Sequence, residues 1–140
     1  MAKKYILALD QGTTSSRAPL AHDFCVISLS DRLTPWSVIE KRLACAAEAD
    51  FAIALYNPSS RGRADYLQRA VRILRSHGKA DDTVCGTVRN IGRPGQRSCI
   101  CTLAKLEGLE ADMFTTVFIG NADTAVIGGR MVTPRGYRGV

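Results

Sequence analysis

The chain has 140 residues, enough for one domain with a hydrophobic core, and its 46% hydrophobic and 23% charged residues argue against a disordered chain. No stretch approaches the roughly 18 consecutive apolar residues of a membrane-spanning helix, so we expect a cytoplasmic protein without membrane contact. The net charge of +6 predicts an acidic partner. A small polyanionic metabolite explains this charge as well as nucleic acid does, and no aromatic platform for stacking nucleic-acid bases is visible.

Apolar runs and helical repeats alternate along the chain. The run over 24–29 predicts a buried strand, and Thr34-Pro35 suits the N-cap and first position of a helix over 35–49. The remaining expected elements are strands over 51–56, 83–88, 98–103 and 114–119, a helix over 63–77 and a helical turn near 103–106. Gly128-Gly129 predicts a hairpin joining 125–127 to 131–133. This order predicts an α/β fold: a mixed sheet with flanking helices and a mixed edge at the hairpin.

The five cysteines form no CxxC pair and have no histidine-rich neighbourhood. They are Cys25, Cys45, Cys85, Cys99 and Cys101. We expect reduced thiols that pack as small apolar side chains, and no metal site.

Three predicted strands end in turn-forming residues, at Tyr56-Asn57-Pro58, Arg89-Asn90-Ile91-Gly92 and Gly120-Asn121. Ligands of open α/β sheets usually lie against the carboxyl ends of strands, so we expect these loops to meet along one wall of a binding site. The alternative is that Asn and Gly simply form turns here, which they often do. No phosphate-binding glycine loop and no nucleophile elbow is present, so no catalytic side chain is predicted.

Blocks spread over residues 18–140 resemble the precorrin-3B C(17)-methyltransferase family, in the family's order and spacing. These blocks are Ala18–Phe24, Ile27–Asp31, Leu33–Trp36, Ala54–Pro58, Val88–Asn90, Gly92–Gly95, Gly120-Asn121 and Gly129–Tyr137. The resemblance implies the C-terminal domain of a class of enzymes that transfer a methyl group from S-adenosylmethionine (SAM) to a ring carbon of a tetrapyrrole. It places the reaction in cobalamin synthesis, with precorrin-3B or its cobalt form as substrate.

The resemblance also implies the residues of the site and a homodimer. Candidate SAM-binding residues are Tyr56, Asn57, Asn90, Gly92 and Gly120. Candidates for binding the polycarboxylate tetrapyrrole are His22, Asp31, Thr34, Arg89 and Arg93. Because the sulfonium methyl group is already activated, catalysis in such an enzyme is mainly alignment of the reactants.

Residues 1–17 depart from this pattern. The stretch from Tyr5 to Arg17, which contains Asp10-Gln11-Gly12-Thr13-Thr14, resembles the start of a glycerol kinase. We therefore divide the chain into a kinase-like segment over 1–17, joined by fusion or at a gene-model junction, and a methylase C-terminal domain over 18–140. The competing hypotheses are a fragment of a sugar or polyol kinase and a non-catalytic α/β module that dimerises.

Overall fold

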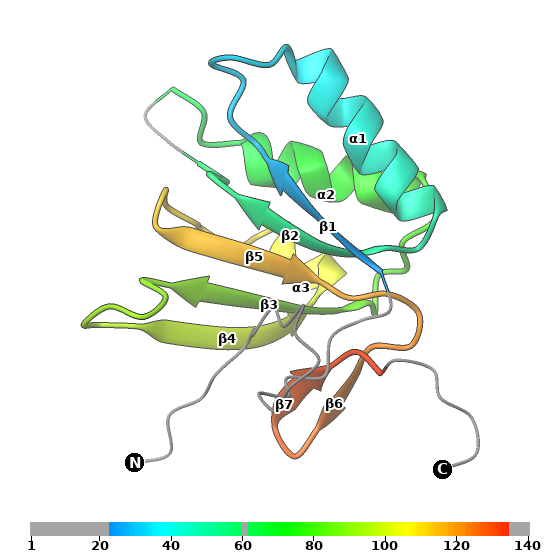
Figure 1. The fold of residues 1–140 in the computed structure, drawn as a ribbon, viewed down its shortest axis with the longest axis vertical. Coiled ribbons are helices and arrows are strands. Elements are labelled where there is room, and N and C mark those ends of the chain that lie inside the picture. The colour runs from blue at the N-terminus through cyan, green and yellow to red at the C-terminus, as the bar shows by residue number, and fades with distance from the viewer. Residues whose placement is uncertain (1–22, 60–61, 135–140) are drawn as a thin grey trace, which may run out of the picture.

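The described part of the chain forms one five-stranded sheet, three helices and a separate hairpin (Figure 1). The computed structural model describes residues 23–59 and 62–134. The sheet strands are β1 (Phe24–Ser28), β2 (Ala52–Tyr56), β3 (Val84–Arg89), β4 (Arg97–Thr102) and β5 (Thr115–Ile119). The other elements are α1 (Trp36–Glu48), α2 (Tyr66–Ser76), α3 (Leu103–Leu106), β6 (Ala125–Ile127) and β7 (Arg130–Val132). The predicted α/β fold with a mixed sheet and flanking helices is confirmed.

The strands of the sheet lie in the order β1-β2-β5-β3-β4. β1 and β2 are parallel, whereas β5 enters between β2 and β3 and runs antiparallel to both. β4 pairs only with β3, so it forms one outer edge of the sheet, and the residues of its first half are exposed. The hairpin of β6 and β7 is a sheet of its own, so the expectation that it forms an edge of the main sheet is wrong.

The helices cover one face of the sheet, as Figure 1 shows for α1 and α2. Their buried side chains repeat at helical spacing, as predicted, and pack with alternate residues of the strands. The main core contains Ile39 and Leu43 of α1, Leu67, Ala70, Val71 and Leu74 of α2, and Ile53, Leu55, Val117 and Ile119 of the strands. On the opposite face a smaller cluster joins Ala54, Val88 and Phe118, with Met131 of β7 packed against it.

Both long helices begin later than predicted. Pro35, not Thr34, is the N-cap of α1, because its ψ of 143° is extended while its carbonyl oxygen accepts hydrogen bonds from the N–H groups of Val38 and Ile39. The helix expected from residue 63 begins at Tyr66. Within residues 23–59 and 62–134, no helix combines the length and the apolar character needed to cross a bilayer.

The cysteines do not behave alike. Cys85 is fully buried opposite Cys101, and burial, with the neighbouring Cys101 adding to it, raises the pKa of the Cys85 thiol to about 12. This thiol packs as a small apolar residue, as expected. Cys45 and Cys99 are exposed, contrary to the expectation.

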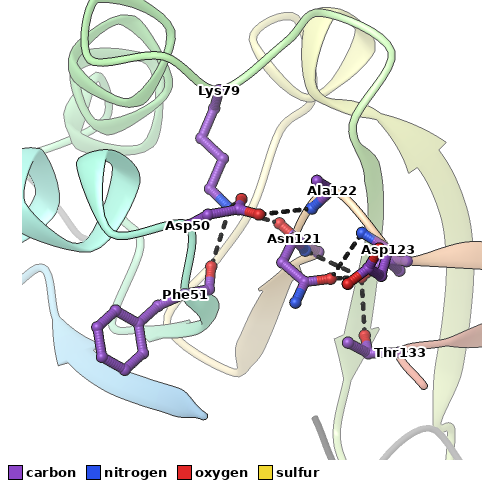
Figure 2. Close-up of polar contacts among 9 residues, drawn as sticks. Asp50, Phe51, Lys79, Asn121, Ala122, Asp123 and Thr133 are labelled. Atoms are coloured by element: carbon purple, nitrogen blue, oxygen red, sulfur yellow. Dashed lines mark hydrogen bonds and ion pairs between the residues drawn. The ribbon is translucent and has the colours of Figure 1, made fainter. Parts of the chain in front are cut away.

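A buried lysine joins three connections by hydrogen bonds at the end of the sheet where β2 begins and β5 ends. The side chain of Lys79, only 2% exposed, donates to Asp50 Oδ1 at 2.8 Å and to the carbonyl oxygens of Phe51 and Gly120, both at 2.9 Å. Asp50 Oδ2 in turn accepts from the Ala122 N–H at 3.0 Å. Figure 2 shows Lys79 extending from the connection after α2 toward this carboxylate. Burial acts to raise the pKa of Asp50, but the hydrogen bonds from Lys79 and Ala122 and the lysine charge hold it below its usual value.

We predict that Lys79→Met destabilises the protein by about 2–4 kcal/mol, because a buried carbonyl, a half-buried carbonyl and a carboxylate lose their donor together. Lys105→Met is the control, since Lys105 is exposed on α3, and it should change the free energy of unfolding by less than about 0.5 kcal/mol. Urea denaturation of the two variants and the parent chain measures both effects. Equal stability of the two variants would contradict a structural role for the buried ammonium.

Candidate functional site

The strands terminate at the end of the sheet opposite Lys79. β1 and β2 end there, β3 ends there because it is antiparallel to β5, and β5 begins there. A pocket of about 250 Å³ lies at this end of the sheet. Its lining residues are Tyr56, Asn57, Asn90, Ile91, Arg93, Met113, Phe114, Thr115 and Thr116.

The pocket brings together four of the predicted site residues: Tyr56, Asn57, Asn90 and Arg93. Gly92 belongs to the same loop but does not line the pocket. Its φ is +69°, which favours glycine, and its N–H donates to Gln96 Oε1 at 2.7 Å. The loop after β3 is therefore held by its own hydrogen bonds and presents Asn90 and Arg93 to the pocket.

Both asparagines have a left-handed backbone, with φ of 53° at Asn57 and 54° at Asn90. Asn tolerates this conformation better than other residues with a side chain, which explains Asn at the point where each strand turns away. The side-chain Nδ2 of Asn57 donates to Ser28 Oγ at 3.4 Å. The side-chain amide of Asn90 has no hydrogen-bond partner among residues 23–59 and 62–134. Two amides thus stand at the pocket, one of them with both donor and acceptor unused by the described chain.

Gly120 lies elsewhere. It follows β5, and because β5 is antiparallel to its neighbours, Gly120 lies at the opposite end of the sheet. The expectation that all three strand-end loops share one wall is therefore wrong. Its N–H donates to the Val84 carbonyl at 2.9 Å and its carbonyl accepts from Lys79. A Cβ on Gly120 would lie 2.5 Å from Thr124 Cβ, so close packing against Thr124 explains the glycine.

Of the predicted tetrapyrrole-binding residues that the structure describes, only Arg93 lines the pocket. Arg89 Nε pairs with Asp112 Oδ2 at 2.7 Å. Burial acts to raise the pKa of Asp112, but hydrogen bonds from Arg89, Thr115 and the Phe114 N–H hold it below its usual value. Thr34 precedes α1 and does not line the pocket, and His22 lies outside the described residues.

Asp31 lies in the connection between β1 and α1, where both carboxylate oxygens are engaged. Oδ1 accepts from Arg63 Nη1 at 3.1 Å, and Oδ2 accepts from the Tyr66 hydroxyl at 2.5 Å. The hydrogen bond from Tyr66 has the largest effect and lowers the pKa of Asp31. Burial acts to raise this pKa, and the hydrogen bond and charge of Arg63 add to the lowering. The same contact with Asp31 raises the pKa of Tyr66.

Sequence analysis missed the apolar part of the pocket. Ile91, Met113 and Phe114 are 51%, 58% and 49% exposed, which is unusual for side chains of their size gathered at one place. Met113 and Phe114 precede β5, so the signal needed to place them here was the antiparallel direction of that strand. Among the described residues, no group of three or more His, Cys, Asp or Glu is arranged to hold a metal ion.

The family model described as Tetrapyrrole (Corrin/Porphyrin) Methylases matches residues 7–107. The chain belongs to this family. The match begins inside the segment that resembles a glycerol kinase, so the kinase resemblance is not supported for this chain.

The chain is similar to two proteins named as C(17)-methyltransferases and to one methyltransferase of known structure. A probable cobalt-factor III C(17)-methyltransferase of Salmonella typhimurium is 50% identical over 120 residues, covering 86% of this chain and 49% of that protein. A precorrin-3B C(17)-methyltransferase of Sinorhizobium sp is 46% identical over 127 residues, covering 87% and 50%. The crystal structure of the methyltransferase CobJ superposes with a TM-score of 0.73 at 40% identity, covering 84% of this chain and 48% of that one. The predicted resemblance is confirmed, and the chain spans about half the length of the relatives it matches.

We predict that Asp31→Asn lowers the pKa of Tyr66 toward the ordinary value of 10.0, because it weakens the hydrogen bond and removes the charge that favour the neutral phenol. The stabilisation from this bond is present below the pH at which an unfolded tyrosine ionises and is lost as the pH rises through the higher folded pKa. Phenolate absorbance during an alkaline titration measures the shift, and Tyr66→Phe identifies which ionisation belongs to Tyr66. An unchanged Tyr66 titration in Asp31→Asn would contradict the contact.

Proposed function

We propose that the chain forms one wall of the cofactor site of a SAM-dependent C(17)-methyltransferase that acts on precorrin-3B or its cobalt form in cobalamin synthesis. The observation that carries the proposal is the pocket at the end of the sheet opposite Lys79, where the amides of Asn57 and Asn90 lie beside the exposed side chains of Met113 and Phe114. Support also comes from two relatives whose names specify C(17) methylation.

The size of the pocket fits half of a cofactor site better than a whole one. Its volume of about 250 Å³ lies below the roughly 300–1,000 Å³ of pockets that enclose a small-molecule ligand. We propose that the other wall comes from the part of the longer relatives that this chain does not match. In that arrangement, residues 18–140 are the C-terminal methylase domain, and residues 1–17 contribute no kinase chemistry.

The residues of the pocket suit SAM, which carries polar groups and an adenine ring with flat aromatic faces. When bound, SAM supplies an electrophilic methyl group. The Asn90 amide, free to donate and accept, and the Asn57 amide fix the orientation of the bound molecule. Tyr56, Met113 and Phe114 cover its apolar surface and exclude water, so the protein contributes alignment rather than proton transfer.

Arg93 is the residue we propose for recognition of substrate carboxylates. It lines the pocket, and it has no ion-pair partner among the described residues. Its guanidinium group matches a carboxylate with two parallel hydrogen bonds. Arg89 would have to leave Asp112 before it could do the same, so it is the weaker candidate. Cytoplasmic location and a homodimer belong to the same proposal.

A non-catalytic α/β module is the alternative, and a hybrid enzyme distinguishes the two. We predict that the part of the Sinorhizobium relative that this chain does not match, joined ahead of Ala18, yields a protein that binds S-adenosylhomocysteine and methylates a precorrin substrate. In this hybrid, Asn90→Ala should weaken S-adenosylhomocysteine binding about three- to tenfold, the loss of one or two hydrogen bonds. Calorimetry measures the binding.

Lys41→Ala, on the exposed side of α1, is the matched control and should leave binding unchanged. A folded hybrid that neither binds the cofactor product nor methylates would favour the non-catalytic module. Equal affinity of Asn90→Ala and Lys41→Ala would move the cofactor away from this pocket.

A further inference from the structure

We infer that Asp31 is a positioning residue, which fixes the Asn57 amide at the pocket through Arg63, Ser30 and Ser28 and does not itself contact the substrate. The inference deepens the proposed function and rests on it, because Asn57 lines the pocket assigned to the cofactor.

Hydrogen bonds link Asp31 to Asn57 through Arg63, Ser30 and Ser28, and within Ser30 the link passes from the side-chain hydroxyl to the backbone N–H. Arg63 Nη1 donates both to Asp31 Oδ1 at 3.1 Å and to Ser30 Oγ at 2.9 Å. The Ser30 N–H donates to Ser28 Oγ at 3.3 Å, and the same oxygen accepts from Asn57 Nδ2 at 3.4 Å. The last two bonds are long, so the position of Ser28 Oγ depends on how firmly Ser30 is held from the other side.

The geometry of Asp31 suits an anchor and not a substrate contact. Each carboxylate oxygen already accepts from a different side chain, Arg63 and Tyr66. A further carboxylate brought close to Asp31 would meet a like charge. The resemblance to C(17)-methyltransferases therefore marked a residue that serves the pocket from outside it.

Tyr66 fixes the far end of this series. Its ring lies 4.6 Å from that of Trp36, centroid to centroid, and the Arg69 guanidinium lies 4.1 Å from the Trp36 centroid. A tilted aromatic contact between the first residues of α1 and α2, with the Arg69 cation over the Trp36 ring, thus holds the hydroxyl group that bonds Asp31. Tyr66, which holds Asp31, thus belongs to a helix, whereas Asn57 belongs to the connection after β2.

Asn57 needs such support because its conformation does not hold the amide by itself. A left-handed residue after a strand has a backbone that the following turn must maintain, and the terminal torsion of an Asn side chain is broad. The hydrogen bond to Ser28 is the contact that selects one orientation of the amide. Without it, the amide would rotate freely at the pocket.

Nuclear magnetic resonance of the 140-residue chain tests the inference directly. The probe is the pair of side-chain amide signals of Asn57, assigned by their loss in Asn57→Asp. We expect Asp31→Asn and Ser28→Ala to move both signals toward those of a freely rotating amide. Ser28→Thr, which keeps the hydroxyl group, should restore them. Asp81→Asn breaks a different Asp–Arg pair, that with Arg75, and should leave them in place.

Unmoved Asn57 signals in a folded Asp31→Asn variant would overturn the inference. If that variant does not fold, Ser28→Ala and Ser28→Thr decide, and equal Asn57 signals in these two would overturn it as well. Loss of stability alone does not separate Ser28→Ala from Ser28→Thr at this single amide, so a merely structural role predicts no such rescue. Failure of the hybrid enzyme to bind S-adenosylhomocysteine would count against the proposed function and leave these signals as they are.

Discussion

The buried ammonium of Lys79 fixes the position of β5, and the rest of the sheet depends on that position. It holds the Gly120 carbonyl at the end of β5 and the Phe51 carbonyl just before β2, while Asp50 reaches across to the N–H of Ala122. A buried charge must keep its acceptors, so the end of β5 cannot slide without taking one of the three acceptors away from Lys79. Because β5 lies between β2 and β3, its register sets the alignment of both neighbours.

The antiparallel direction of β5 determines the character of the pocket. A parallel central strand would have placed its carboxyl end beside Asn57 and Asn90, with Gly120 among them. The reversed strand instead brings its beginning there, so the exposed side chains of Met113 and Phe114 stand beside the two amides. A wall with apolar surface and a few convergent polar groups is what small-molecule sites generally require.

Local patterns in the sequence predicted the elements but not their order in the sheet. The spacing of Leu67 and Leu74 identifies the buried face of α2, because that pattern depends only on the helical repeat. Asn57 and Asn90 could be selected because each ends a strand. Gly120 was misplaced because strand direction depends on pairings that no local window contains. The roles of Asp31 and Arg89 depended on partners 32 and 23 residues away, Arg63 and Asp112.

Among residues 23–59 and 62–134, no strand pairs with the outer side of β4. Its outer backbone N–H and C=O groups face away from β3, and such an edge accepts a strand from another molecule. Arg97 is the single charged residue in β4, so little on the strand itself opposes such pairing. The net charge of +6 keeps molecules apart at low ionic strength, and added salt screens that repulsion. Pairing between molecules along β4 is therefore opposed by long-range charge repulsion, and that opposition weakens as the salt concentration rises.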